Sequence, residues 1–290
     1  MSDTIRDHFY RIRKHILFDP VNTGQRLHYL LNYLRWQTRG KYGKDRWLIT
    51  FDNGLRSYVH PFPDHDAGEM NIWTRNVDYH DTLLVRRVLK KGDRIVDAGC
   101  NVGNRTWALA DLIGGALMID AGTAAIARVQ ENRDLNGLSA NDFVTIHKAV
   151  GERPGVVRFT DEGGAYTRNM VVDADDPTSK PIVEVEMTTI DIEVARIGWH
   201  PTYLKIDVEG QDLPALKAAI GVLRSGDVRL VKLEHNATEP LAPLMTFFHE
   251  LGWTVFTLVK GRITQDMRHM EKEMNLFAAP PAIFAMLTGH

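Results

Sequence analysis

The sequence predicts an α/β fold, a doubly wound and mostly parallel Rossmann-like sheet that carries a helical and β-hairpin cap at its N-terminal end. From about residue 94 onward, short β-branched runs alternate with helical patterns of ten or more residues. This alternation is typical of a parallel sheet with helices on both faces, and right-handed crossovers make it doubly wound. Before residue 90 the alternation is absent, so the first part of the chain is expected to form a cap.

Two patterns define the expected cap, which we predict to cover residues 1–75. Leucines recur at the i, i+3, i+4 and i+7 spacing of an amphipathic helix: Leu27, Leu30, Leu31 and Leu34. The apolar runs 47–51 and 55–59 flank an Asn53-Gly54 turn, and Asn-Gly favours the type I′ turn of a β-hairpin. The remaining residues, 76–290, are predicted to form one α/β domain.

The elements of this domain follow in order from the apolar runs. Strands are predicted at 94–98, 116–120, 143–147, 203–207, 228–234 and 253–259, and helices at 103–112, 123–135, 213–223 and 241–251. The runs 155–160 and 182–187 flank a polar loop and are predicted to form an antiparallel excursion. If the strand order is 3-2-1-4-5, the carboxyl ends of the first and fourth strands lie side by side, where open α/β sheets bind ligands.

Composition and charge exclude several classes of protein. The 290 residues contain one cysteine, Cys100, which excludes an internal disulfide framework and a zinc cluster built on cysteines. It also favours a reducing, cytoplasmic setting. The formal net charge of −2 argues against a chain that binds nucleic acid over its whole surface. We expect neither a cleaved secretion signal nor a membrane-spanning helix from the sequence.

The net charge hides an asymmetry between the two ends of the chain. Residues 1–46 contain ten Lys and Arg against four acidic residues, a charge of +6, and the remainder therefore carries −8. In the basic segment, aromatic and aliphatic residues lie between the charges, and helices of this kind can lie on anionic membranes. Packing against the α/β domain or a second subunit is the simpler explanation. Peripheral membrane contact and homo-oligomer contact are both open.

The first motif that points to chemistry is Val-Asp-Ala-Gly-Cys-Asn-Val-Gly at 96–103, between a predicted strand and a predicted helix. A glycine-rich turn here lets the backbone approach a nucleotide-like ligand closely. The Gly-x-x-x-Gly spacing and the preceding Asp97 depart from the pattern that binds a pyrophosphate, which favours a ligand without phosphates. A plain tight turn is the alternative.

The second feature is Asp120, which ends the next predicted strand, 21 positions after Gly99. A carboxylate at this distance can accept both hydroxyl groups of a ribose, although an exposed acid at a strand end is the alternative. Together, the glycine turn and the spaced acid point to S-adenosylmethionine (SAM). The residues predicted to bind SAM are Asp97, Gly99, Cys100, Asn101, Val102, Gly103, Asp120, Ala121 and Ala149.

The third motif, Leu-Lys-Ile-Asp-Val-Glu-Gly at 204–210, ends the fourth predicted strand. Its carboxylates are expected to face the reactive end of the ligand, with a capping pair as the alternative. Methyl transfer to a hydroxyl group needs a general base, and the imidazole after the fifth strand titrates near neutral pH. The predicted catalytic candidates are therefore Asp207, Glu209 and His235, and the choice of base among them is open.

A polar loop after the hairpin contains residue types that bind divalent metals: His60, Asp64, His65, Asp66 and Glu69. The prolines and glycine of the same loop indicate a solvated segment, which explains these residues without a metal. No metal site is therefore expected.

The segments 96–103 and 204–210 resemble the two signature motifs of FkbM-type methyltransferases. The Asn132, Asn136 and Gly137 pattern resembles the end of that family's second helix. Thr-Thr-Ile-Asp at 188–191 resembles its Thr-Leu-Asp segment before the fourth strand. The resemblance runs from about residue 70 to 280 and is most specific at 205–210.

This resemblance implies a class I methyltransferase domain that uses SAM to methylate a hydroxyl group of a sugar, a glycan or a glycosylated metabolite. Two positions depart from the family: Asp120-Ala121 replaces a frequent Glu-Pro, and His80 replaces a frequent Glu. The expected partner is a small-molecule or glycan acceptor, with no nucleic acid, because an Asn/Asp-Pro-Pro-aromatic motif is absent.

Three other functions are also compatible with the sequence. One is O-methylation of a polyketide-type natural product. Another is an NAD-dependent dehydrogenase or epimerase, which the missing third glycine and the missing Tyr-x-x-x-Lys pair disfavour. The third is a non-catalytic cofactor-binding module.

Overall fold

The computed structural model describes residues 8–40, 42–62, 67–76, 78–165, 169–172, 178–235 and 240–289. The N-terminal elements are η1 (Ile12–Leu17), η2 (Pro20–Asn22), α2 (Arg26–Arg35), η3 (Trp36–Gly40), β1 (Trp47–Thr50), β2 (Arg56–Val59) and η4 (Ala67–Ile72). The first part of the α/β region comprises α3 (Tyr79–Val88), β3 (Arg94–Ala98), α4 (Asn104–Trp107), β4 (Gly115–Asp120), α5 (Thr123–Leu135), β5 (Phe143–His147), β6 (Ala149–Val150), β7 (Gly155–Thr160), β8 (Val171–Val172) and β9 (Ile182–Thr188). Its second part comprises α6 (Ile190–Ile197), β10 (Tyr203–Ile206), α7 (Asp212–Lys217), α8 (Ile220–Arg224), β11 (Leu230–Glu234), α9 (Ala242–Glu250), β12 (Thr254–Val259), β13 (Arg262–Thr264), α10 (Met267–Met270), β14 (Asn275–Ala279) and α11 (Pro281–Thr288).

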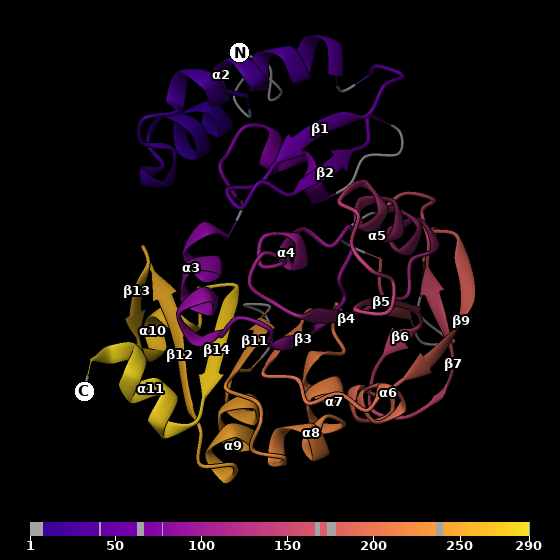
Figure 1. Cartoon of the computed structure of the whole chain (residues 1–290), viewed down its shortest axis with the longest axis vertical. Helices are drawn as coiled ribbons and strands as arrows, with labels where there is room; N and C mark the ends of the chain where they lie inside the picture. The colour runs from indigo at the N-terminus through magenta and orange to yellow at the C-terminus, as the bar shows by residue number, and fades with distance from the viewer. Residues whose placement is uncertain are drawn as a thin grey trace.

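The central sheet has the order β13-β12-β14-β11-β10-β3-β4-β5 (Figure 1). Strands β5, β4, β3, β10 and β11 are parallel, whereas β14 is antiparallel to both β11 and β12. Read in chain order, the parallel part is 3-2-1-4-5, the order on which the expected meeting of the first and third motifs depends. The carboxyl ends of β3 and β10 are therefore neighbours, at the place where the strand order reverses.

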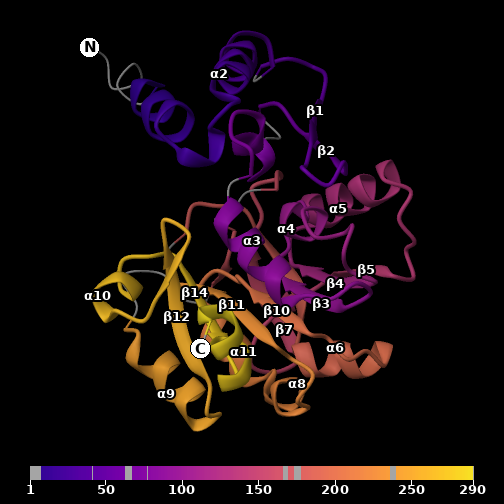
Figure 2. The same ribbon diagram turned by 60° about the vertical axis from the view of Figure 1, so that its left-hand side comes forward.

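Helices cover both faces of this sheet, which confirms the doubly wound α/β prediction (Figure 2). Alternate strand residues point to opposite faces, so Ile95 packs with one hydrophobic cluster and Val96 with the other. The first cluster includes apolar side chains of α3, α4, α5 and α11, and the second includes those of α6, α7, α8 and α9.

A second sheet, of order β6-β9-β7-β8, branches from the end of β5. Strands β7 and β9 pair antiparallel from Gly155↔Met187 to Thr160↔Ile182, which confirms the predicted excursion. This sheet carries its own small apolar cluster of Ala121, Ala149, Phe159 and Val185.

Two predicted helices are shorter than the sequence pattern indicates. The helix expected at 103–112 ends at Trp107, after which the chain continues in i, i+3 hydrogen-bonded turns such as Leu112 N to Leu109 O, 2.9 Å. The helix expected at 213–223 is divided into α7 and α8. The carboxylate of Asp191 accepts hydrogen bonds from the amides of Gly221 and Val222, both at 2.8 Å, and so caps a new helix N-terminus at this point.

The amphipathic helix predicted from the four leucines is present as α2, but it buries a different face from the one that the leucines mark. Helix α2 buries Tyr29 and Tyr33, whereas the leucine stripe is exposed, with only Leu30 partly buried: Leu27, Leu31 and Leu34. The spacing of the leucines identified the helix. The larger aromatic side chains lie on the buried face, because their burial removes more apolar surface from water.

An aromatic core explains this choice. Tyr33 packs edge to face on Trp73 with ring centroids 5.3 Å apart, and Trp36 packs in the same manner on Trp47 at 5.9 Å. The indole of Trp36 also donates a hydrogen bond of 2.9 Å to Glu69. The helix, the hairpin and η4 are thus joined by packed aromatic side chains.

The hairpin is attached to the α/β region by two asparagines at the end of α5. Asn132 accepts a hydrogen bond of 2.8 Å from the amide of Tyr58, and Asn136 accepts one of 2.8 Å from the amide of Arg56. Asn136 also donates to the carbonyl of Arg56 at 2.7 Å. These side chains satisfy the exposed edge of β2, which otherwise has unpaired backbone groups.

We predict that Asn132→Ala lowers the free energy of unfolding by about 1–3 kcal/mol, because it leaves the amide of Tyr58 without its acceptor inside the protein. Asn132 is fully buried and its amide also donates to the carbonyl of Val102 at 3.4 Å. The exposed Asn141→Ala is the control and should change stability by less than about 0.5 kcal/mol. Equal effects of the two substitutions in urea denaturation would contradict the role of Asn132.

Candidate functional site

The turn after β3 lies directly against the end of β10. Gly99 has φ +71°, and a Cβ atom placed there would lie 1.7 Å from the carbonyl oxygen of Asp207. The amide of Asp207 in turn donates to the carbonyl of Ala98 at 3.1 Å. Because no side chain fits between these backbones, glycine is required at this position. The first and third sequence motifs therefore meet, as predicted.

Asp120 holds the same turn from the neighbouring strand. Its carboxylate oxygens accept hydrogen bonds from the amides of Asn101 and Gly122, each at 2.8 Å. Each oxygen keeps a lone pair for a further donor, so the carboxylate can also accept hydrogen bonds from ribose hydroxyl groups. Burial raises the pKa of Asp120, although the two amides oppose the shift.

The other predicted cofactor residues line or support this turn. Burial and the nearby carboxylates of Asp120 and Asp97 raise the pKa of the Cys100 thiol, as expected of a packing residue rather than a nucleophile. Val102 packs with Ala125 and Ala165. Gly103 has φ +80° and lies against the indole of Trp107. Ala121 and Ala149 share the small cluster of the second sheet.

Two buried acceptor atoms flank the turn without a hydrogen bond from any described residue: Oδ1 of Asp97 and Oδ1 of Asn104. The first lies 3.3 Å from Nζ of Lys205 but without hydrogen-bond geometry. Buried acceptors of this kind are rare in folded proteins. They suit a ligand rich in N–H and O–H donors, such as the amino and hydroxyl groups of SAM.

The structure adds a layer of charged side chains that the sequence reasoning missed. Asp97, Lys205 and Lys232 are paired across β3, β10 and β11 in one row, so their side chains lie on one face of the sheet. Lys205 and Lys232 are only 4% and 3% exposed. Asp78 and Asp81, at the start of α3, and Arg105 of α4 meet this row from the covering helices.

The ammonium group of Lys205 is the centre of one half of this layer. It lies 3.0 Å from the carboxylate of Asp207 and donates to the carbonyl of Gly99 at 2.5 Å. Burial opposes its charge, but the carboxylates of Asp207 and Asp97 raise the pKa of Lys205. The same ion pair outweighs the burial of Asp207 and lowers the pKa of its carboxyl group. Asp207 is therefore held ionised.

Lys232 is the centre of the other half. Its Nζ lies 3.3 Å from the carboxylate of Asp81, which also accepts a hydrogen bond of 2.7 Å from Asn275. Burial and the charge of Arg105 lower the pKa of Lys232 to about 8. Arg105 forms an ion pair with Asp78, so the layer connects α3, α4 and β14 to the sheet.

Glu234 stands beside Asp207, because the two follow paired positions at the ends of β11 and β10. Burial, a hydrogen bond with Asp207 and the charge of that carboxylate raise the pKa of Glu234 to about 8. Two carboxyl groups with widely separated pKa values are a typical acid–base arrangement. Glu234 could have been found in the sequence as a carboxylate at the end of a predicted strand. The charged layer could have been found from the lysines, Lys205 and Lys232, that lie inside two apolar runs.

The other two catalytic candidates lie in different environments. Glu209 is exposed and has φ +44°, an unusual value for a residue other than glycine. His235 is buried at the end of β11, and its amide donates to the carbonyl of Met274 at 2.6 Å. Neither placement decides between them, and the choice of base stays a prediction.

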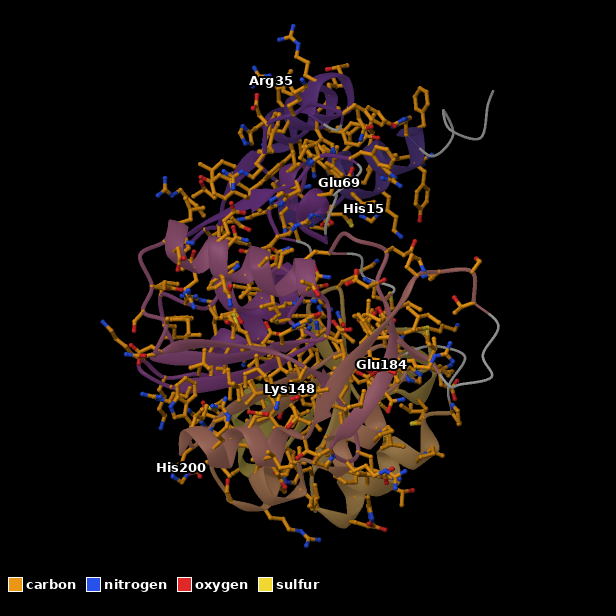
Figure 3. All side chains as sticks on the ribbon, turned by 90° about the vertical axis from the view of Figure 1, so that its right-hand side faces the viewer. His15, Arg35, Glu69, Lys148, Glu184 and His200 are labelled. Atoms are coloured by element: carbon orange, nitrogen blue, oxygen red, sulfur yellow. The ribbon has the colours of Figure 1, made fainter. Side chains whose placement is uncertain are left out.

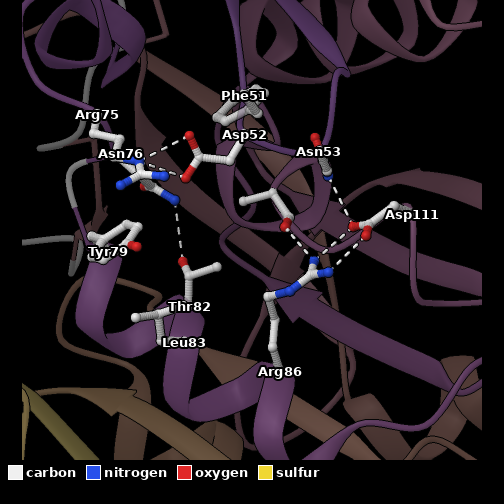
Figure 4. A pocket seen from close by; sticks show the side chains of 11 residues that line it. Phe51, Asp52, Asn53, Arg75, Asn76, Tyr79, Thr82, Leu83, Arg86 and Asp111 are labelled. Atoms are coloured by element: carbon white, nitrogen blue, oxygen red, sulfur yellow. Dashed lines mark hydrogen bonds and ion pairs between the residues drawn. The ribbon is translucent and has the colours of Figure 1, made fainter. Parts of the chain in front are cut away.

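A cavity of about 230 Å³ lies between α3 and the hairpin (Figure 4). It is on the side of α3 that faces away from the charged layer. None of the predicted site residues lines it. Its two cations are neutralised, since Arg75 contacts Asp52 at 2.8 Å and Arg86 contacts Asp111 at 2.6 Å. We therefore assign no role in catalysis to this cavity.

No group of three or more metal-binding side chains occurs among the described residues. Of the polar loop considered above, Asp64, His65 and Asp66 lie outside the part of the chain that the structure describes. Within the described segments no helix is long and apolar enough to cross a membrane.

Residues 143–254 match the protein family described as Methyltransferase FkbM domain. Part of the chain, 112 of its 290 residues, is thus similar to the FkbM methyltransferase domain. This match confirms the resemblance stated from the sequence motif at 204–210, which lies within the matched residues. A search of curated proteins found no match.

Solved structures with a similar fold include an FkbM methyltransferase from Methylobacillus flagellatus, at 16% identity and a TM-score of 0.46, with 64% of this chain and 43% of that one covered. This chain therefore spans less than half of that protein. Two others are a SAM-dependent methyltransferase from Agrobacterium tumefaciens (11% identity, TM-score 0.45, 81% and 70% covered) and TrmK from M. capricolum in complex with S-adenosylhomocysteine (9% identity, TM-score 0.36, 69% and 66% covered).

The contact at Gly99 can be tested against a glycine with the same backbone strain. Gly92 has φ +90° and open space within 4 Å of the position that a Cβ atom would take, whereas Gly99 has the backbone of Asp207 in that space. We expect Gly92→Ala to cost about 1–2 kcal/mol for the left-handed conformation. Gly99→Ala should cost about 1–3 kcal/mol more because of the overlap. Equal losses of unfolding free energy in chemical denaturation would show that the turn can move away from β10.

Proposed function

We propose that this chain transfers the methyl group of SAM to a hydroxyl group of a sugar, a glycan or a glycosylated metabolite. The observation that carries this proposal is the pair of carboxyl groups, Asp207 and Glu234, beside a turn that fits a ribose-containing cofactor. Methyl transfer to oxygen requires removal of the hydroxyl proton, which is the chemistry that such a pair can supply. The alternatives retained from the sequence become outcomes of the tests below.

The cofactor is proposed to lie across the turn between Gly99 and Gly103, with its ribose at Asp120. Bound there, SAM supplies an electrophilic methyl group on a positively charged sulfur. The turn is held in place where Gly99 packs against the backbone of Asp207. The Oδ1 atom of Asp97 accepts no hydrogen bond from a described residue, which suits a donor-rich ligand. Alignment of acceptor and methyl group at near-attack distance supplies much of the rate acceleration.

We propose that Glu234 receives the acceptor proton and that Asp207 positions it. Asp207 is kept ionised by Lys205 and is therefore a weak base, whereas the ionised form of Glu234 is a stronger one. Bound SAM would supply the methyl group, and the Glu234 carboxylate would take the hydroxyl proton of the acceptor and pass it to water. In this proposal Glu209 and His235, which the sequence analysis gave as candidate bases, would orient the acceptor instead.

The setting of the enzyme is also part of the proposal. We propose a cytoplasmic protein with a cap at 1–75 and a methyltransferase domain at 76–290. The basic N-terminal segment would supply its contact with a membrane or with a second copy.

Cofactor binding separates the main functional alternatives. Isothermal titration should give heat with SAM and none with NAD. We expect Asp120→Ala to weaken SAM binding by about 1.5–3 kcal/mol, roughly tenfold or more, because hydrogen bonds to a charged acceptor are lost. Asp207→Ala should instead reduce methyl transfer from labelled SAM to a panel of hexoses and glycosides, with little change in SAM affinity. Binding of NAD alone would contradict the proposal, and SAM binding unchanged by Asp120→Ala would contradict the ribose assignment.

The environment of Glu234 predicts how stability depends on pH. Its pKa is raised in the folded chain from 4.5 to about 8, so between these values the folded state binds more protons than the unfolded state. Stability contributed by Glu234 is then present at pH 4 and is lost as the pH rises toward 8. The neutral Glu234→Gln should match the wild type near pH 5 and become progressively more stable than it up to pH 9. A difference in unfolding free energy that stays constant with pH would contradict this environment.

A further inference from the structure

The outward face of α2 is apolar. Leu27, Leu31 and Leu34, the α2 stripe, are 70%, 43% and 47% exposed. At roughly 100° per residue they fall within an arc of about 60° on the helix. The buried side chains of Tyr29 and Tyr33 lie on the opposite side. A single exposed leucine is ordinary, but three in one row leave a continuous apolar ridge on a helix that has already buried its other face.

The neighbouring turn η1 and its flanks add exposed aromatic side chains. Phe9 and Phe18 are 65% and 68% exposed. The ammonium group of Lys14 lies 5.2 Å from the ring centre of Tyr10, and the guanidinium of Arg13 lies 5.6 Å from that of Phe18. These side chains present an apolar body and a positive charge together.

The charges of this region are almost all positive. Within residues 8–40 the only acidic residue is Asp19, whereas six basic residues are all exposed: Arg11, Arg13, Lys14, Arg26, Arg35 and Arg39. Arg26 and Arg35 belong to α2 itself. The apolar stripe is thus accompanied by cations with very little compensating negative charge.

This combination determines the kind of partner. A second copy joined through the same face would place its cations against those of the first, because a two-fold interface uses the same surface twice. An anionic bilayer offers hydrocarbon for leucine side chains and headgroup charge for the arginines. We propose that α2 lies flat on an anionic lipid surface, with Leu27, Leu31 and Leu34 inserted and the flanking arginines at headgroup level.

The position of α2 permits this contact. The helix lies at the end of the molecule opposite α8 and α9 (Figures 1 and 2), and Arg35 lies at the same end (Figure 3). The central sheet therefore stays in water when this end meets a membrane. The inference does not depend on the methyl-transfer chemistry, so the two can fail separately.

Flotation of the full chain with vesicles tests the proposal. In about 0.1 M NaCl the chain should bind vesicles of phosphatidylcholine that contain about 30% phosphatidylglycerol. Its affinity for them should be about tenfold higher than its affinity for vesicles of phosphatidylcholine alone. The binding should fall in about 0.5 M NaCl because the charges are then screened. Failure to bind the anionic vesicles at low salt would overturn the proposal.

Matched variants separate the two components of the surface. Leu27→Ser, Leu31→Ser and Leu34→Ser combined should reduce vesicle binding at least roughly tenfold, whereas Leu48→Ser, at a 43% exposed leucine of β1, should not. Arg26→Gln with Arg35→Gln should also weaken it. Lys90→Gln with Lys91→Gln removes the same charge from an exposed site elsewhere and should have a smaller effect. Circular dichroism checks that the variants are folded.

Two results of this series would overturn the proposal. One is unchanged vesicle binding by a folded triple leucine variant. The other is a concentration-dependent dimer in analytical ultracentrifugation that the triple variant abolishes, since the stripe would then be an interface between copies of this chain.

Discussion

The buried ammonium group of Lys205 holds together the parts of the site that come from different strands. It contacts the carbonyl of Gly99, the carboxylate of Asp207 and, at 3.3 Å, that of Asp97. A buried charge is costly unless it is paired, so these three groups cannot move apart independently. The turn after β3 and the carboxyl end of β10 are fixed relative to each other by this requirement.

The same constraint explains why a polar layer is tolerated inside an apolar sheet. Each lysine of the row lies within 3.3 Å of a carboxylate: Lys205 near Asp97 and Asp207, and Lys232 near Asp81. Among the described side chains of the layer, carboxyl groups outnumber cations, and such an environment complements a positively charged sulfur at the proposed reaction centre. The side chains that stabilise the layer are therefore also those that the proposed chemistry would use.

The N-terminal cap is connected to this centre through a buried side-chain amide. Asn132 bonds to the hairpin at Tyr58 and to the turn after β3 at Val102. The outer helix of the cap shows the reverse of the usual arrangement, because an aromatic core occupies one face and leaves leucines on the other.

The sequence by itself predicted the α/β class, the hairpin and the two motifs that meet at Gly99 and Asp207, because periodicity and turn-forming residues are local properties. The strand order 3-2-1-4-5 was an assumption that the structure bears out. The predicted type I′ turn at Asn53-Gly54 is wrong, because only Gly54 has a positive φ. The sequence did not determine which face of α2 is buried, the division of the helix after β10 by Asp191, or the pairing of Asp207 with Glu234. Those depend on residues far apart in the chain competing for the same space or the same charge. Only the tertiary structure brings such competitors together.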